Sequence, residues 1–330
     1  MLDSTIAYSL DLYRLDAGTR AKVIDILNKL EKDLIAQLSQ RQTEWGKQRI
    51  NQLLREARDT IQTYYKAAQL ELNLTTDGLA QITAKATQNA LQATVSVAVG
   101  LPTETMLSSI AGDAIIMGAT QAGWWAKQEA DTAFRFAAAV RQGLVAGETN
   151  AQIIARVLGK QGFPSVMDIS RANAAALVQT SVQTVANNAR LATLQANAEI
   201  VPHLKWVATL DGHTCIICAA RDGMMWDTAT LDPIDGALPF LNPPIHFNDR
   251  CVLVGDMGLT TPGMRASSIG PVSRETTFSQ FLDRMGADYQ NEVLGKGRAD
   301  LYRAGKLTLQ DLVNGKGNPI SLAQLKEKYQ

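Results

Sequence analysis

Apolar side chains in the first part of the chain recur every three or four residues within otherwise polar segments. One such row comprises Val23, Ile26, Leu27, Leu30, Leu34 and Leu38. A second row comprises Ile50, Leu53, Leu54, Ala57, Ile61, Tyr64, Tyr65 and Ala68. This spacing places the apolar side chains on one face of an α-helix and the polar side chains on the other. The pattern therefore predicts two long amphipathic helices, each of which needs a partner surface.

The middle of the chain is also predicted to be helical, with glycine and proline residues separating the helices. Further helices are predicted over residues 77–99, 151–158 and about 166–199. The first of these ends at Gly100-Leu101-Pro102, after which Thr103 begins a new helix, and the second is closed by Gly159. A turn at residues 162–164 leads into the third, which is rich in alanine and can pack tightly on other helices.

Residues 110–126 are apolar and rich in glycine and alanine, and we expect them to form one buried, closely packed helix. The segment contains Asp113, Thr120 and Gln121. It is also shorter than the ~20 residues that a helix needs to cross a bilayer. No membrane partner is therefore expected.

All cysteines and histidines of the chain lie between His203 and Cys251. Four of them form a spaced motif, in which the pair Cys215 and Cys218 is followed by the pair His246 and Cys251. A C-x2-C with a later H-x4-C supplies three thiolates and one imidazole, which is a ligand set of closed tetrahedral zinc sites. The sequence therefore predicts a structural Zn2+ held by these four residues, with no catalytic residues and no other cofactor.

The surroundings of the first cysteine pair predict a β-rich knuckle. Asp211-Gly212 precedes the pair and Asp222-Gly223 follows it, and both dipeptides favour tight turns with positive φ angles. Residues 204–208 and 251–254 carry β-branched and aromatic side chains and are expected to be short strands. Residues 219–245, between the two ligand pairs, are rich in proline and glycine and are expected to be a loop excursion.

Other interpretations of these residues stay open at this point. The cysteines could be buried apolar side chains, and Cys215 with Cys218 could be a disulfide or redox pair. Zinc is favoured because a C-x2-C in the company of an H-x4-C is uncommon. Arg250, beside the last predicted ligand, either offsets the negative charge of a three-thiolate site or is an ordinary exposed arginine. His203 and His213 are expected to have surface or hydrogen-bonding roles.

Composition narrows the remaining possibilities. The 32 basic and 32 acidic side chains leave no overall field that would hold nucleic acid, so any contact with DNA would be local. A length of 330 residues is enough for two domains with cores of their own. Three cysteines clustered at a metal-like spacing favour a reducing compartment. The first residues do not resemble a secretion signal, and synthesis in the cytoplasm is expected.

The order of residues along the second half of the chain forms a longer pattern. An Ala- and Asn-rich helix is followed by a Trp, an Asp-x-x-Thr-Cys-x-x-Cys-x4-Gly stretch, a Pro-Pro-x-His and a final Cys. The residues concerned are Thr180, Asn187, Asn188, Ala189, Trp206, Asp211, Thr214, Cys215, Cys218, Gly223, Pro243, Pro244, His246 and Cys251. In this pattern residues 170–256 resemble the Mu F-like head morphogenesis, or minor capsid, proteins of tailed bacteriophages. That family usually has Cys-Arg-Cys after the histidine, whereas this chain has Asp249-Arg250-Cys251 and keeps only the last cysteine.

The C-terminal segment is similar to the tail that often follows this phage module. The residues that carry this similarity are Phe281, Leu282, Asp283, Arg284, Tyr289, Gln290, Val293, Leu294, Gly295, Arg298, Leu301, Gly305, Lys306, Leu307, Leu322 and Leu325. In structural terms the tail is expected to form two or three short amphipathic helices, with Gly295 and Gly305 ending helices.

These elements together predict a mainly α protein with three parts. Residues 1–160 are expected to form an elongated helical body. Residues 165–257 are expected to form a small α+β module that contains the zinc knuckle, and residues 258–330 a helical C-terminal tail.

The resemblance implies a phage minor capsid or head morphogenesis protein that is not an enzyme. It would be present in few copies, associated with the portal vertex, and would support head assembly or genome delivery. The expected partners are the portal protein and the major capsid protein, with sister copies in a homo-oligomer and packaged DNA as further candidates. The expected location is the virion, and the host cytoplasm during assembly.

The alternative is a zinc-containing, treble-clef-like nuclease or a toxin carried by a phage. In such nucleases a histidine beside the first cysteine pair activates water, and His213 with Asp211 lies in that neighbourhood. No second histidine or asparagine follows at a useful place. The H-x-E motif of base deaminases and the H-E-x-x-H motif of metalloproteases are both absent from the sequence.

Overall fold

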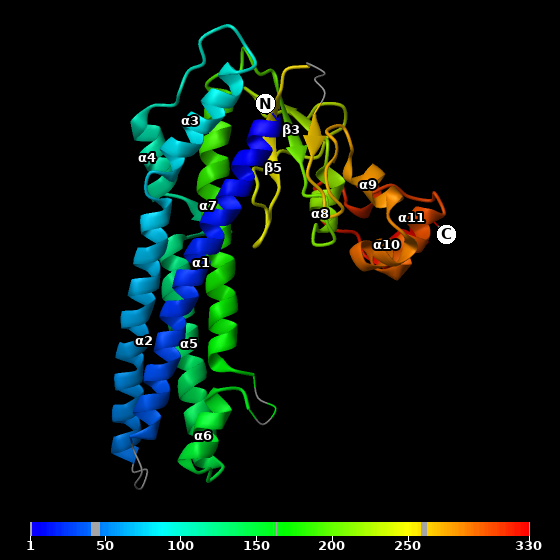
Figure 1. Ribbon diagram of the computed structural model, residues 1–330. Coiled ribbons are helices and arrows are strands. Elements are labelled where there is room, and N and C mark those ends of the chain that lie inside the picture. Colours follow the sequence, from blue (N-terminus) through cyan, green and yellow to red (C-terminus); the bar gives the residue numbers. More distant parts are fainter. Residues whose placement is uncertain (1, 41–46, 161, 163, 259–262, 330) are drawn as a thin grey trace. The chain divides into compact units, whose positions relative to one another are not determined.

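The computed structural model describes residues 2–40, 47–160, 162, 164–258 and 263–329. It confirms a mainly α protein (Figure 1). The described residues form two compact units that are interleaved along the chain. One unit is built from residues 12–79 and 111–182, and the other from residues 1–11, 80–110 and 183–330. We call them the helical unit and the cysteine unit. The two units are defined by contacts between residues and not by continuous stretches of sequence. The division into residues 1–160, 165–257 and 258–330 therefore stays a prediction.

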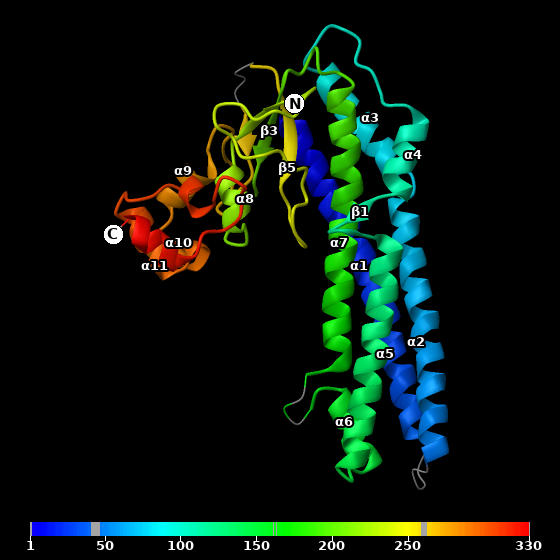
Figure 2. The same cartoon turned by 180° about the vertical axis from the view of Figure 1, so that it is seen from behind.

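The helical unit is built from long helices that lie side by side (Figures 1 and 2). Its elements are α1 (Leu2–Ser39) from residue 12 onward, α2 (Lys47–Thr76), α5 (Gln121–Val145), α6 (Asn150–Val157) and α7 (Val166–Gln195) up to residue 182. The apolar rows predicted from the sequence face inward, since Leu27, Leu30, Leu34, Leu53, Ile61 and Tyr65 are at most 1% exposed. The two amphipathic helices are therefore confirmed, and each finds its partner surface within this unit.

Polar side chains inside the helical unit form a connected chain between three helices. The hydroxyl oxygens of Tyr65 on α2 and Thr132 on α5 are 2.8 Å apart, and those of Thr132 and Ser170 on α7 are 2.7 Å apart. Tyr65 also meets the edge of the Trp125 ring, with ring centroids 6.1 Å apart. Because buried hydroxyl groups need partners, these contacts fix how α2, α5 and α7 pack against one another.

The helix predicted over residues 110–126 is wrong. Helix α4 (Glu104–Gly112) ends early, and two short strands, β1 (Ile115–Ile116) and β2 (Ala119–Thr120), pair antiparallel before α5 begins. Between the strands Met117 and Gly118 have φ angles of 47° and 85°. Two consecutive positive φ angles make a tight hairpin turn, and Thr120 then caps α5 by accepting a hydrogen bond from the backbone N–H of Gly123 at 3.1 Å. The turn at Met117-Gly118 and the cap at Thr120 thus interrupt the helix that the apolar composition of this segment suggested.

The other helices predicted in the middle of the chain are confirmed. The helix predicted over residues 77–99 is present as α3 (Leu79–Gln92), but it ends at Gln92, well before the predicted stop at Gly100, and α4 begins directly after Thr103. Thr149 forms a capping box with Gln152 at the start of α6, and Gly159 follows this helix with a φ of 73°. Of the predicted turn at residues 162–164, residue 163 lies outside the described residues.

The cysteine unit is organised around a three-stranded antiparallel sheet. Strand β3 (His203–Val207) lies in the centre, between β4 (Met225–Asp227) and β5 (Val252–Asp256). Strands β3 and β5 confirm the two predicted strands, while β4 lies in the region predicted to be only a loop. The inner face of the sheet packs into a core that includes Leu91, Leu194, Trp206, Trp226 and Leu253.

The C-terminal segment belongs to the same unit and adds a second core. Its elements are β6 (Met264–Arg265), β7 (Val272–Ser273), α9 (Phe278–Arg284), α10 (Ala287–Leu294), α11 (Lys296–Arg303), the 3-10 helix η1 (Gln310–Leu312) and α12 (Leu322–Tyr329). The described part of the tail thus holds four short α-helices, one more than the largest number expected. Gly295 and Gly305, with φ angles of 76° and 66°, follow α10 and α11 as predicted. Leu210 and Ala219 join Phe278 and Phe281 in this core.

Among the helices that the structure describes, none has a stretch that is both long enough and apolar enough to span a membrane.

Candidate metal centre

The first cysteine pair is carried by a helix. Cys215 is the residue that precedes α8 (Ile216–Arg221) and Cys218 lies in its first turn. Residues three apart on a helix lie on the same side, so the thiols of Cys215 and Cys218 face the same region of space. The predicted β-rich knuckle is therefore wrong, and the reason is that a six-residue helix is too short to show a hydrophobic period.

The turns that flank the pair differ from one another. Gly223 has a φ of 83°, as the Asp-Gly dipeptide predicts. Gly212 is not among the residues with positive φ, so the same expectation is wrong there. A Cβ atom at Gly212 would lie 3.5 Å from the hydroxyl of Tyr289, an ordinary van der Waals contact, so α10 packs beside this turn.

The second ligand pair comes from the loop that leads into β5. The Nε2 atom of His246 lies 3.2 Å from the Sγ of Cys215 and 3.3 Å from the Sγ of Cys218. Cys251 directly precedes β5 and is 3% exposed, on the same side of the strand as Leu253. These four residues line one small cavity of about 10 Å³, a volume that suits a single ion or water. The structure thus brings all four predicted residues together.

Asp249 is a fifth candidate that the sequence did not reveal. Its side chain is buried, and its Oδ1 lies 3.6 Å from the Sγ of Cys218. Its two oxygens accept hydrogen bonds from the backbone N–H groups of Ile245 and Cys251, each at 2.9 Å. Cys218, Asp249 and Cys251 form one metal-compatible group, and Cys215, Cys218 and His246 form another. Asp249 thus shapes the loop that carries two of the predicted ligands.

The donor set fits a divalent, thiophilic cation such as Zn2+. The Nδ1 of His246 is 2.8 Å from the carbonyl oxygen of Phe247, an arrangement in which Nδ1 donates its proton and Nε2 is left to face the thiols. Ligand atoms around a tetrahedral zinc lie about 3.5–3.8 Å apart, given metal bonds of about 2.0–2.3 Å. The distances from His246 to the two thiols are a few tenths of an ångström shorter, so these three ligands need only small adjustments. Cys251 is grouped with Cys218 and Asp249, so a shell of all four predicted ligands also requires Cys251 to move closer to the other two.

The electrostatics of the cluster also favour a cation. The hydrogen bond from Cys218 lowers the pKa of Cys215 to about 4, while burial raises the pKa of Cys251 to about 12. The hydrogen bond to Cys215 raises the pKa of Cys218, and the one between Cys215 and His246 raises the pKa of His246 to about 9. One of the three cysteines therefore ionises easily, whereas ionisation of a second is unfavourable. A bound metal ion would stabilise all three thiolates and displace their protons.

Arg250 stabilises the loop of the first cysteine pair. Its two Nη atoms lie 2.5 Å and 2.8 Å from the carboxylate of Asp211, which also accepts a hydrogen bond from the backbone N–H of His213 at 3.0 Å. Burial opposes ionisation of Asp211, but the hydrogen bonds and charge of Arg250 outweigh it and lower the pKa of this carboxyl. Thr214 donates to the carbonyl oxygen of Thr209 at 2.5 Å. Asp211 and Thr214, both members of the family pattern, thus position Cys215.

The remaining histidines are not members of the two metal-compatible groups of the described residues. His203 is at the start of β3, opposite Asp227 and Asp256 in the neighbouring strands. His213 lines the same small cavity as the four predicted ligands.

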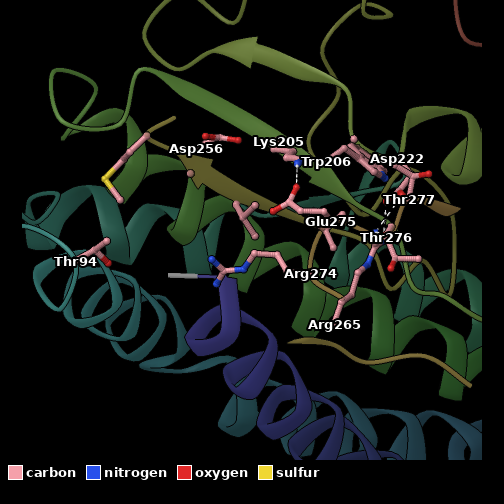
Figure 3. A pocket seen from close by; sticks show the side chains of 15 residues that line it. Thr94, Lys205, Trp206, Asp222, Asp256, Arg265, Arg274, Glu275, Thr276 and Thr277 are labelled. Carbon is pink, nitrogen blue, oxygen red and sulfur yellow. Dashed lines mark hydrogen bonds and ion pairs between the residues drawn. The ribbon is translucent and has the colours of Figure 1, made fainter. Parts of the chain in front are cut away.

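A polar cleft lies on the outer face of the sheet, where Lys205 and Glu275 face each other (Figure 3). The Nζ of Lys205 is 3.6 Å from Oε2 of Glu275. Arg265, which also lines the cleft, pairs with Asp222 at 2.7 Å, and both side chains are at most 7% exposed. With a volume of about 90 Å³ the cleft is much smaller than the ~300 Å³ at which ligand pockets begin. Its geometry therefore supports a structural contact.

The Asp222 carboxylate connects the sheet to the tail. It accepts hydrogen bonds from the backbone N–H groups of Ala208 and Phe278, each at 2.7 Å. Arg265 in turn donates to the carbonyl oxygen of Thr276 at 2.6 Å. Because Asp222 directly follows α8, this network fixes the cysteine-bearing helix against β3 and α9.

Comparison with known protein families matches part of the chain to a family model. Residues 135–254 match the family model described as Phage Mu protein F like protein. No curated protein and no solved structure matches the chain. The matched region starts in α5, earlier than the resemblance at residues 170–256 suggested, and it stops at residue 254. The similarity of the C-terminal segment to the segment that often follows this module stays a prediction. Residues 135–254, which include all four predicted metal ligands, thus form a Mu protein F-like region, and the family resemblance is confirmed.

Proposed function

We propose that this protein is a minor capsid or head morphogenesis protein of a tailed bacteriophage. The observation that carries the proposal is the Mu protein F-like match over residues 135–254, which contains α6, α7, the sheet and the cysteine cluster. We further propose that it is present in few copies at the portal vertex, with the portal protein and the major capsid protein as partners.

The proposed role of the metal is structural. Zn2+ held by Cys215, Cys218, His246 and Cys251 would tie α8 to the loop before β5. Both elements join the sheet core, which contains Cys218 and Cys251 beside Trp206 and Leu253. In such small sites the free energy of metal binding becomes folding free energy. A metal that ties these two elements together would make the module more rigid, which suits a protein that must dock onto other head proteins.

The helical unit is the part we propose for protein contacts during assembly. Its side chains facing solvent include Phe134, which is 74% exposed, and Val145, which is 90% exposed. Large apolar side chains at the surface are candidates for contact with another protein. Sister copies are therefore further candidate partners, while packaged DNA has weaker support because the chain has no net charge.

The experiment that tests this function is the composition of purified particles of the phage that carries the gene. We expect the protein in the particle at a few copies, located at one vertex by antibody labelling. A strain with the gene deleted is expected to make fewer filled heads, and expression in trans is expected to restore them. Absence of the protein from particles, together with normal assembly, packaging and infection of the deletion strain, would contradict the proposal.

A phage nuclease or toxin is the second candidate, because His213 lines the metal cavity. The proposed site has four protein ligands and so leaves no open position for an activated water. We therefore expect His213→Ala to retain head assembly, with zinc content unchanged. Incubation of the purified protein with DNA and Zn2+ or Mg2+ is the direct check. Metal-dependent cleavage that disappears in His213→Ala would favour the nuclease.

A further inference from the structure

Arg221 is a charged side chain at the centre of the cysteine unit. It is 0% exposed and lies at the end of α8, three residues after Cys218. Its Nη1 donates a hydrogen bond to the carbonyl oxygen of Pro239 at 2.9 Å, and its guanidinium carbon lies 5.8 Å from the centroid of the Trp206 ring. A Cβ atom at Gly317 would lie 2.6 Å from its Nη2, so the turn that contains Gly317 covers the guanidinium closely.

This buried cation has no carboxylate partner among the described residues. Its Nε and Nη2 atoms also lack a hydrogen-bond acceptor there. Two other arginines of the unit are neutralised, since Arg265 pairs with Asp222 and Arg250 pairs with Asp211. Burial of a charge is costly unless an opposite charge compensates for it. Arg221 therefore calls for a source of negative charge that is not an aspartate or glutamate.

The cysteine cluster is that source. The Trp206 ring over which Arg221 lies belongs to the same core as Cys218 and Cys251. A zinc ion with three thiolates and one neutral imidazole carries a net charge of about −1. Residues three apart on a helix share a face, so Arg221 and Cys218 lie on the same side of α8. The carbonyl end of this helix adds a smaller favourable field for a cation.

We propose that Arg221 is the counter-charge of the metal centre, a positioning residue that neutralises the zinc–thiolate cluster from within the core. This inference rests on the proposed zinc centre. It also assigns to Arg221 the role that the sequence suggested for Arg250, whose charge is taken up by Asp211. In this arrangement the metal and the buried arginine stabilise each other, and loss of either leaves an uncompensated charge in the interior.

The test is the zinc affinity of purified full-length variants, measured by competition with a chromophoric chelator. Arg221→Lys keeps the positive charge, while Arg221→Gln keeps an N–H donor for the Pro239 carbonyl and removes the charge. We expect the Lys variant to stay within about threefold of the wild type. The Gln variant is expected to bind zinc about 10–100-fold more weakly, the range found when residues that support metal ligands are removed. Arg156→Gln, which breaks a charge pair with Glu148 in the helical unit, is the control and should leave the affinity unchanged.

A second readout separates charge from packing. With Co2+ in place of zinc, the sulfur-to-metal charge-transfer band reports the electrostatic potential at the thiolates. Loss of a nearby cation makes the sulfur electrons easier to transfer, so the band of the Gln variant should move to longer wavelength. The band of the Lys variant should keep the wild-type position. If Arg221 has only a structural role, the charge-transfer band has the wild-type position in both variants.

The outcomes distinguish this inference from the zinc centre itself. If the wild-type protein binds no zinc, the proposed zinc centre is wrong, and the role proposed for Arg221 is wrong as well. A wild-type protein that binds zinc, with Lys and Gln variants of equal affinity and equal Co2+ spectra, overturns the inference alone. Circular dichroism of the zinc-loaded proteins shows which variants are folded. If only the Gln variant is unfolded and excess zinc restores its structure, the charge requirement is supported.

Discussion

Asp249 organises the loop that leads into β5 with a single carboxylate. One oxygen faces the N–H group of Ile245 and the other faces that of Cys251, and the side chain is 2% exposed. Asp249 directly follows Asn248, whose positive φ of 62° reverses the chain direction between His246 and Cys251. A buried carboxylate with two backbone donors is strongly directional, and it sets the spacing of the two ligands.

Asp249→Asn is expected to weaken the centre, because an amide can accept from one N–H group but presents a second donor to the other. A buried donor without an acceptor costs about 1–3 kcal/mol of the free energy of unfolding. Zinc affinity is expected to fall about 10–100-fold, as for other groups that orient metal ligands. Chemical denaturation and chelator competition measure the two effects. Asp256→Asn, at the far end of β5, is the control, and an equal loss in both variants would contradict the role given to Asp249.

Asp222 and Arg265 are the other residues whose loss should be severe. Their side chains are 2% and 7% exposed, and removal of one charge leaves the other buried and unpaired. We expect Asp222→Asn to lower the free energy of unfolding by about 3–5 kcal/mol. Asp300→Asn breaks the pair with Arg303 on α11, where the Asp300 side chain is 55% exposed, and should cost about 0–1 kcal/mol. Equal denaturation midpoints for the two variants would show that the buried network contributes little.

At the scale of elements, turns and caps decide where the helices end. The link between α6 and α7 is an example, because Gly159 has a φ of 73° and a Cβ there would lie 2.5 Å from the backbone nitrogen of Ser165. Ser165 in turn caps α7 by accepting from the N–H groups of Met167 and Asp168, each at 3.2 Å. The glycine thus lets the start of one helix lie against the end of the other.

Gly159→Ala should therefore be more harmful than a similar change at Gly147. Gly147 also has a positive φ, of 67°, but a Cβ there would meet no atom within 4 Å. The left-handed conformation alone costs roughly 1–2 kcal/mol, and the steric conflict at Gly159 is expected to raise the total to roughly 3 kcal/mol or more. Thermal unfolding of the two variants provides the comparison. Similar melting temperatures would indicate that the backbone near Ser165 adjusts without strain.

Sequence periodicity was informative for long elements and failed for short ones. The rows around Leu27 and Ile61 predicted α1 and α2 because each extends over many helical turns. The helix over residues 110–126 was wrong because the Met117-Gly118 turn interrupts an apolar stretch without changing its composition. Helix α8 has six residues and β4 has three, too few for any period to be recognised.

The candidate site was predictable to a similar degree. The identity and spacing of Cys215, Cys218, His246 and Cys251 were enough to predict that these residues lie close together, and they line one cavity. Asp249 and Arg221 could not be recognised, because their importance depends on burial and on backbone groups that only the fold places beside them. An aspartate two residues before a predicted ligand is a weak signal that local hydrogen bonding shapes the loop.

At the scale of the whole molecule, packing divides the chain differently from its sequence pattern. The helical unit and the cysteine unit each combine distant segments, and α1 and α7 contribute residues to both. The tail shares a core with Leu210 and Ala219, so it is an integral part of the cysteine unit. A structural metal beside these shared cores would influence the stability of the whole unit.

Zinc content of the purified protein is the most direct test of the account. Protein prepared without chelators is expected to hold about one zinc per chain by elemental analysis, because the four ligands complete one tetrahedral shell. Cys251→Ala is expected to lose most of this zinc and to unfold the cysteine unit, since metal binding energy is folding energy in such sites. A wild-type protein that is fully folded and free of metal, with a Cys251→Ala variant of the same stability, would contradict the zinc centre.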